Sequence, residues 1–113
     1  MDIQFLHIDS ASDLFDRIDA LNISAFPEYE RMESRKLLEM SSSSSLSLLA
    51  IMDGELFVGF TVIFCPSRLC YVFFLAIEPS LRGRSYGSAV LDALRKRYPG
   101  KQLVLDIEPL EEQ

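Results

Sequence analysis

The sequence contains little of what several common classes of protein need. It has one histidine and two cysteines in 113 residues, and the two cysteines do not form a Cys-x-x-Cys pair, so no metal site is expected. Acidic residues outnumber basic ones, 17 to 11, which gives a net charge of −6. Because such a surface repels phosphates, nucleic acid is not an expected partner.

Long apolar runs and targeting signals are also missing from the sequence. No hydrophobic stretch approaches the roughly 20 residues that span a bilayer, so no membrane partner is expected. The first residues, Met1-Asp2-Ile3-Gln4-Phe5, lack the basic segment that opens a secretory signal. The sequence therefore predicts a cytoplasmic protein.

The two cysteines flank a short segment, Cys65-Pro66-Ser67-Arg68-Leu69-Cys70, that reads as a hairpin connection. A hairpin would place the two thiols opposite each other, so a cross-strand disulfide is one outcome. Two small reduced thiols that behave as apolar side chains are the favoured outcome.

The composition otherwise fits one globular domain over residues 1–113. Hydrophobic residues make up 49% and charged residues 25% of the chain, which is ordinary for such a domain. The acidity is compatible with a cationic substrate such as an amine, although a net charge that only favours solubility is the plainer interpretation.

Hydrophobic periodicity predicts the element order strand, two helices, three strands, helix and strand. The predicted ranges are 3–8, 14–26, 31–40, 46–51, 55–64 and 69–77, then a helix from 89 to 98 and a strand over 101–107. Gly59 predicts a bulge or a close backbone approach inside its strand. The run 69–77 is apolar on both faces, which places it inside a covered sheet, parallel to the strand that follows the crossover helix. The fold class is therefore α+β, with a mixed, mostly antiparallel sheet flanked by helices.

The loop between strand 69–77 and the next helix combines groups that bind phosphate. The first turn of a helix offers free N–H groups and a partial positive charge. Gly83 and Gly87 permit close backbone approach, and Arg82 and Arg84 add cationic donors. An ordinary strand-to-helix turn with exposed arginines is the alternative on these residues alone.

The stretch Arg82-Gly83-Arg84-Ser85-Tyr86-Gly87-Ser88 resembles the acetyl-CoA motif of GNAT N-acetyltransferases. In that motif Gln or Arg is followed by two variable residues, Gly, one variable residue, and Gly or Ala. Arg82 and Gly87 match the two ends, and Ser85 stands where the family usually has its first Gly. The segment 74–79 and the order of elements are also similar to the family. The resemblance implies a GNAT-like fold that lacks the family's C-terminal helix and last strands.

The resemblance also implies an activity: acetyl transfer from acetyl-CoA to a primary amine of a small molecule or peptide, without a metal. Backbone N–H groups of residues 84–88 would hold the pyrophosphate, and the strand end 75–77 would pair with the pantetheine arm. A bulge in that strand would open a gap for the thioester. The implied coenzyme-binding residues are Leu75, Ala76, Ile77, Arg82, Gly83, Arg84, Ser85, Tyr86, Gly87 and Ser88.

Acyl transfer to an amine also needs a base for the ammonium and an acid for the thiolate. Glu108 is the first candidate base or substrate anchor, and Glu28 and Glu30 are the next. An ordinary surface carboxylate is the plainer interpretation of each. Tyr71 and Tyr86 are candidate proton donors whose plainer roles are packing and loop cover.

Two other functions remain open at this point. The chain could be a non-catalytic acyl-CoA-binding or interaction module with a degenerate GNAT fold. A generic phosphate-binding α/β domain is a weaker alternative, because it does not explain the two N-terminal helices. The edge of strand 101–107 invites pairing, so a homo-oligomer formed through that edge is a further expectation.

Overall fold

The computed structural model describes residues 1–8, 13–26, 33–41 and 46–105 of the chain. Its elements are β1 (Ile3–His7), α1 (Leu14–Ala25), α2 (Ser34–Ser41), β2 (Leu46–Asp53), β3 (Leu56–Phe64), β4 (Leu69–Ile77), the short 3-10 helix η1 (Pro79–Leu81), α3 (Tyr86–Arg97) and β5 (Gln102–Leu105). This order confirms the order of helices and strands predicted from the sequence, and η1 is an addition to it.

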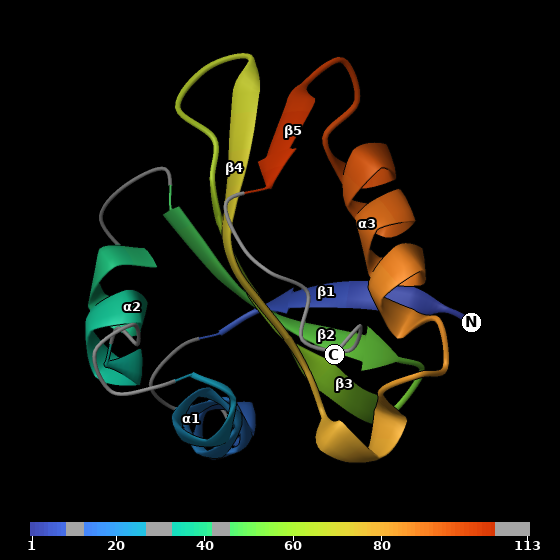
Figure 1. Cartoon of the computed structure of the whole chain (residues 1–113). Helices are drawn as coiled ribbons and strands as arrows, with labels where there is room; N and C mark the ends of the chain where they lie inside the picture. Colours follow the sequence, from blue (N-terminus) through green and yellow to red (C-terminus); the bar gives the residue numbers. More distant parts are fainter. Residues whose placement is uncertain (9–12, 27–32, 42–45, 106–113) are drawn as a thin grey trace.

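The strands form one sheet in the order β1-β2-β3-β4-β5 (Figure 1). Neighbours are antiparallel except β4 and β5, which are parallel because α3 crosses over between them. The mixed, mostly antiparallel sheet predicted from the sequence is therefore confirmed.

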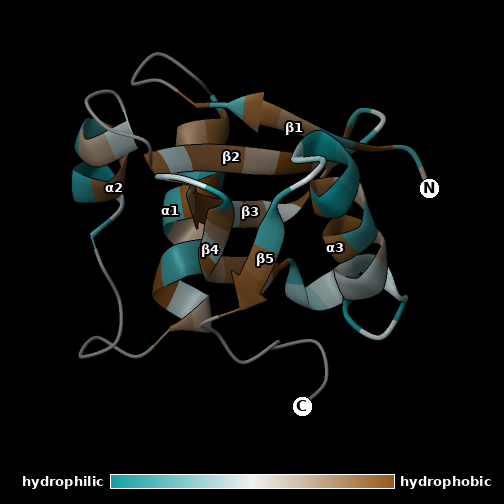
Figure 2. Ribbon diagram, turned by 90° about the horizontal axis from the view of Figure 1, so that it is seen from above, coloured by the Kyte–Doolittle hydropathy of each residue, from teal (hydrophilic) through white to brown (hydrophobic). Residues whose placement is uncertain are grey.

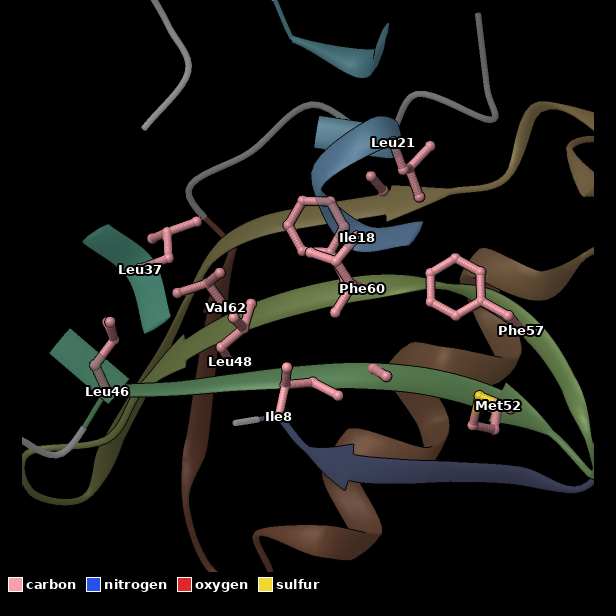
Figure 3. Packing of buried hydrophobic residues seen from close by; sticks show 12 residues of the cluster. Ile8, Ile18, Leu21, Leu37, Leu46, Leu48, Met52, Phe57, Phe60 and Val62 are labelled. Atoms are coloured by element: carbon pink, nitrogen blue, oxygen red, sulfur yellow. The ribbon is translucent and has the colours of Figure 1, made fainter. Parts of the chain in front are cut away.

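Helices cover both faces of the sheet, so the molecule has two cores. Figure 3 shows the first, where Phe60 and Val62 of β3 and Leu48 of β2 lie among side chains of α1 and α2. The second lies under α3 and includes Val90 and Leu94, both fully buried. We call these the α1/α2 core and the α3 core. Figure 2 shows the mostly apolar strands between helices that carry both hydrophobic and hydrophilic residues.

β4 contributes to both cores, as expected for a strand that is apolar on both faces. Ala76 belongs to the α1/α2 core, whereas its neighbours Leu75 and Ile77 belong to the α3 core. All three are at most 1% exposed. The position of β4 inside the sheet follows from this double burial.

Gly59 lies at a bulge and at a close approach of two strands, and the sequence predicted one or the other. The register between β2 and β3 shifts beside it, where Ile51 pairs with Gly59 and Met52 pairs with Phe57. A β-carbon at Gly59 would lie 1.9 Å from the carbonyl oxygen of Ala76. Only glycine therefore lets β3 and β4 approach this closely.

A second bulge interrupts β4 at Phe73. Val62 pairs with Phe74 and Ile63 pairs with Val72, so Phe73 is the extra residue. As a result Phe73 and Phe74 both pack against the α1/α2 core, although they are adjacent in the strand. Among the described residues, β5 pairs with β4 from Leu69 to Val72, before the bulge (Figure 1).

The expectation that the two cysteines are reduced was wrong. Phe64 pairs directly with Tyr71, so the next facing positions across the hairpin are Cys65 and Cys70. Their Cα atoms are 4.2 Å apart, and a disulfide joins them. The hairpin register brings the sulfurs into bonding range, which the residue types alone did not reveal.

Several element ends differ from the predicted ones. β2 continues to Asp53, α2 begins at Ser34, and α3 begins at Tyr86 rather than after Ser88. The sequence predicted a buried strand over 101–107. Both ends of the described strand, Gln102 and Leu105, are exposed. Within the described ranges, no helix is long and apolar enough to cross a membrane.

Candidate coenzyme-binding site

The first turn of α3 presents N–H groups without helical partners. Ala89 donates its N–H to the carbonyl of Ser85 at 3.2 Å, which is the first hydrogen bond of the helix. The N–H groups of Tyr86, Gly87 and Ser88 precede that bond, and the Ser85 side chain does not cap them. Free N–H groups at the positive end of a helix dipole form a site for an anion.

The loop that leads into this turn has two left-handed residues. Gly83 has φ 78° and Ser85 has φ 67°. Ser85 thus adopts the conformation that glycine adopts most easily, at the position where the acetyl-CoA motif usually has glycine. The serine at the position of the motif's usual glycine therefore keeps the left-handed turn.

Arg82 ties the loop to the end of β4. Its Nε donates to the carbonyl of Ile77 at 3.1 Å, and the side chain is half-buried. Arg84, two residues further on, is exposed. The two arginines therefore differ: Arg82 holds the loop in place, and Arg84 leaves a positive charge beside the N–H groups of α3.

Within the described residues, the end of β4 has a backbone edge next to this loop that no strand pairs with. Glu78 donates its N–H to Val58 of β3 at 2.7 Å, and the Thr61 hydroxyl donates to the carbonyl of Phe74 at 2.8 Å. Backbone direction alternates along a strand, so Leu75 and Ile77 turn their N–H and C=O groups away from β3. Arg82 reaches Ile77 from that side. Among the described residues, β5 does not pair with this part of β4.

The three strand residues predicted for the site therefore differ in what they present. Leu75 and Ile77 direct their backbone groups away from β3, to the edge that no described strand pairs with. Ala76 pairs with Phe60 of β3, and its backbone faces that strand. Thr61, whose hydroxyl donates to the Phe74 carbonyl next to the bulge in β4, was not predicted from the sequence. This contact joins two strands, so no pattern within one strand indicates it.

Asp53 is a second residue that the sequence did not single out. The hydroxyl of buried Tyr86 donates to Asp53 Oδ2 at 2.6 Å, and the N–H of Asp2 donates to Oδ1 at 2.8 Å. The Tyr86 hydroxyl, followed by the Asp2 N–H, lowers the pKa of Asp53. The same hydrogen bond, together with burial, raises the pKa of Tyr86. The pair joins the β2–β3 turn to the first turn of α3.

Of the candidates for proton transfer, the structure describes the two tyrosines and none of the three glutamates. Glu108, Glu28 and Glu30 lie outside the described residues. Tyr86 is engaged with Asp53, and Tyr71 lies among other aromatic rings on β4. In the part of the chain that the structure describes, no group of three or more His, Cys, Asp or Glu side chains could hold a metal.

Comparison with protein families assigns the chain. The sequence profile of the acetyltransferase (GNAT) family matches residues 13–110. The chain belongs to the GNAT acetyltransferase family. No curated protein sequence matches it.

Solved structures share the GNAT fold. A proposed GNAT acetyltransferase from Bacteroides thetaiotaomicron aligns with a TM-score of 0.82 and 23% identity, over 96% of this chain and 65% of that one. An aminoglycoside 6'-N-acetyltransferase complexed with coenzyme A aligns with a TM-score of 0.65 and 20% identity, over 84% and 54%. A ribosomal-protein-alanine N-acetyltransferase from Brucella melitensis biovar Abortus 2308 gives 0.67 and 18%, over 95% and 79%.

These identities are low, so the alignments support the fold alone. The chain spans less than two thirds of the length of the first two of these proteins. The α+β GNAT-like fold predicted from the sequence is confirmed, and so is the family.

Proposed function

We propose that this GNAT chain transfers an acetyl group from acetyl-CoA to a primary amine of a small molecule or peptide. The observation that carries the proposal is the adjacency of two sets of backbone groups. The first turn of α3 offers N–H groups to an anion, and the edge of β4 that no described strand pairs with lies next to it, joined through Arg82. An anionic group followed by an amide-containing arm fits that pair of surfaces.

Each part of the site then has a role. The N–H groups of Tyr86, Gly87 and Ser88, with the charge of Arg84, hold the pyrophosphate. The backbone of Leu75 and Ile77 receives the pantetheine amides as an added strand would. When bound, acetyl-CoA supplies a thioester whose carbonyl carbon bonds to the amine nitrogen as the carbon–sulfur bond breaks.

Two further requirements concern charge and protons. An N–H of Leu75 or Ile77 that faces the gap is suited to stabilise the oxyanion. The amine must lose a proton before it attacks, and the leaving thiolate must gain one. Glu108 and Glu28 remain our candidates for the base. The alternative, a non-catalytic acyl-CoA-binding module, has no observation of its own in its favour.

Calorimetric titration with acetyl-CoA and desulfo-CoA tests the coenzyme site. We expect saturable binding of both ligands, weakened roughly 3- to 10-fold by Arg84→Ala because a charge-assisted contact is lost. The matched control is Arg95→Ala, which removes an exposed arginine at the far end of α3 that pairs with Asp92. Absence of binding by the unmodified chain, or equal loss in both variants, would contradict the proposed site.

Release of free thiol from acetyl-CoA, measured with a panel of primary amines, separates the enzyme from the binding module. Turnover supports the enzyme, whereas binding without turnover favours the module. Glu108→Gln and Glu28→Gln then identify the base. The variant that removes it should lower kcat at neutral pH and lose the acidic limb of the pH profile, with acetyl-CoA affinity unchanged.

A further inference from the structure

Three aromatic side chains cluster beside the last described pair of β4 and β5. The ring centres of Phe64, Tyr71 and Phe73 are 6.5, 6.1 and 6.0 Å apart in pairs, and the ring planes lie within 25° of one another. All three side chains are half-buried, so each ring keeps part of its surface open. We call these three residues the aromatic cluster.

The aromatic cluster lies on the face of the sheet opposite α3. Cys70 and Val72 belong to the α3 core, so the residue between them, Tyr71, points to the other face. Phe64 and Phe73 pack against the α1/α2 core. Without the bulge, Phe73 would not share this face with Phe74.

The cluster also lies beside the last β4–β5 pair in the part of the chain that the structure describes. Tyr71 pairs with Val104, and the last pair is Val72 with Leu105. Phe73 is the next residue of β4. A coenzyme held from the α3 side along Leu75 and Ile77 would present its thioester close to this last described pair. An acceptor amine then reaches the thioester from the opposite face, beside the three rings.

We propose that the aromatic cluster is a binding subsite for the apolar part of the acceptor, which is a primary amine carrying an aromatic or alkyl group. The placement of the acceptor rests on the proposed function. Aromatic surfaces bind apolar groups and attract an ammonium ion over their faces. The three side chains provide a single hydroxyl, that of Tyr71, so they suit a largely apolar molecule better than a polyhydroxylated one.

The test compares two primary amines that differ in the apolar group. Calorimetry of the full chain with phenethylamine and with ethanolamine, each with and without desulfo-CoA, measures the subsite directly. We expect phenethylamine to bind at least about tenfold more tightly than ethanolamine, because only phenethylamine covers the rings. Equal affinity for the two amines would overturn the inference.

Variants assign the preference to the cluster. Tyr71→Ala and Phe73→Leu should each weaken phenethylamine binding by roughly 3- to 10-fold and leave ethanolamine unchanged. Tyr71→Phe keeps the ring and should keep the affinity. Phe5→Ala is the control, because Phe5 is a half-buried ring on the distant edge strand β1. Unchanged phenethylamine affinity in both cluster variants would also overturn the inference, and circular dichroism checks that each variant is folded.

The design separates this inference from the proposed function. Amine binding is measured without acetyl-CoA, and the coenzyme titration is independent of the amine. Binding of acetyl-CoA with no preference for phenethylamine would remove the subsite and leave the function. Preference for phenethylamine with no coenzyme binding would contradict the proposed function and leave the aromatic cluster as a binding site for the amine alone.

Discussion

At the scale of single residues, Ser85 has a conformation that its side chain opposes. A non-glycine residue in the left-handed region costs about 1–2 kcal/mol, and Ser85 has φ 67° without a capping hydrogen bond from its side chain. We therefore expect Ser85→Gly to raise the free energy of unfolding by about 0.5–1 kcal/mol, after the entropy that glycine adds to the unfolded chain. Urea denaturation measures the change.

A second serine in the same segment supplies the control. Ser88 lies inside α3, where glycine is a poor helix former, so Ser88→Gly should lower the free energy of unfolding by roughly 0.5–1 kcal/mol. The two substitutions are chemically identical and should have opposite signs. If both destabilise the protein equally, the left-handed strain assigned to Ser85 is not there.

The Asp53–Tyr86 hydrogen bond predicts a specific pH dependence. Because the folded state lowers the pKa of Asp53 from 3.8, its contribution to stability is present above that value and is lost as the pH falls through the folded-state pKa. Because the folded state raises the pKa of Tyr86 from 10.0, its contribution is present below that value and is lost as the pH rises through the folded-state pKa.

Replacement of the hydroxyl tests both limbs. Tyr86→Phe should flatten the acid limb and remove the alkaline limb of a plot of unfolding free energy against pH, obtained from urea denaturation at each pH. Tyr98→Phe is the control, since Tyr98 is a half-buried tyrosine at the opposite end of α3, away from the hydrogen bond between Tyr86 and Asp53. An identical pH profile for Tyr86→Phe and the unmodified chain would rule out the role given to this pair.

At the scale of elements, the contact between β3 and β4 depends on the absence of a side chain. A methyl group at Gly59 would overlap the Ala76 carbonyl oxygen, which lies 1.9 Å from the position of the added carbon. We expect Gly59→Ala to lower the free energy of unfolding by about 2–3 kcal/mol and to weaken acetyl-CoA binding, because the end of β4 must shift. Urea denaturation and calorimetry measure the two effects.

Gly54→Ala distinguishes this overlap from simple backbone strain. Gly54 has φ 62°, and nothing lies within 4 Å of an added β-carbon. Its replacement should cost about 1 kcal/mol and leave coenzyme affinity unchanged. Weakened coenzyme binding in Gly54→Ala, or normal binding in Gly59→Ala, would contradict the link between this contact and the site.

Local patterns in the sequence determine the helices and strands. Pairing between strands and packing between elements determine the features that the sequence did not reveal. Hydrophobic periodicity predicted the elements and their order. A glycine inside a strand, Gly59, predicted a bulge or a close backbone approach. The residues themselves gave no signal for the Phe73 bulge, because two adjacent phenylalanines fit an apolar strand equally well with or without one, and only the family resemblance implied a bulge in this strand. The disulfide and the Asp53–Tyr86 pair depend on register across strands and on packing between elements, which one sequence does not specify.

At the scale of the whole molecule, the sequence determines the family and the fold. It does not determine the oligomeric state, the location or the acceptor. Self-association through the edge of strand 101–107 stays a prediction. So does the cytoplasmic location, and the Cys65–Cys70 disulfide weighs against it, because disulfides are rare in reducing compartments. Family membership likewise leaves the acceptor open, since one fold serves many substrates.

The sheet makes the two cores parts of one cooperative unit. Ile18 and Leu94 are both fully buried, one in the α1/α2 core and one in the α3 core, on opposite faces of the same strands. We expect Ile18→Val to cost about 1 kcal/mol and Leu94→Ala about 3 kcal/mol. Because the sites share no contacts, the double variant should cost about 4 kcal/mol and still unfold in one transition.

Thermal unfolding followed by circular dichroism, with urea denaturation for the free energies, checks this expectation. Two separate transitions in either single variant would mean that each helical layer unfolds by itself. A double-variant cost that differs from the sum by more than about 1 kcal/mol would mean that the sheet transmits strain from one face to the other. Agreement with the sum would mean that the two cores stabilise the two faces of the sheet, β4 included, without coupling through it.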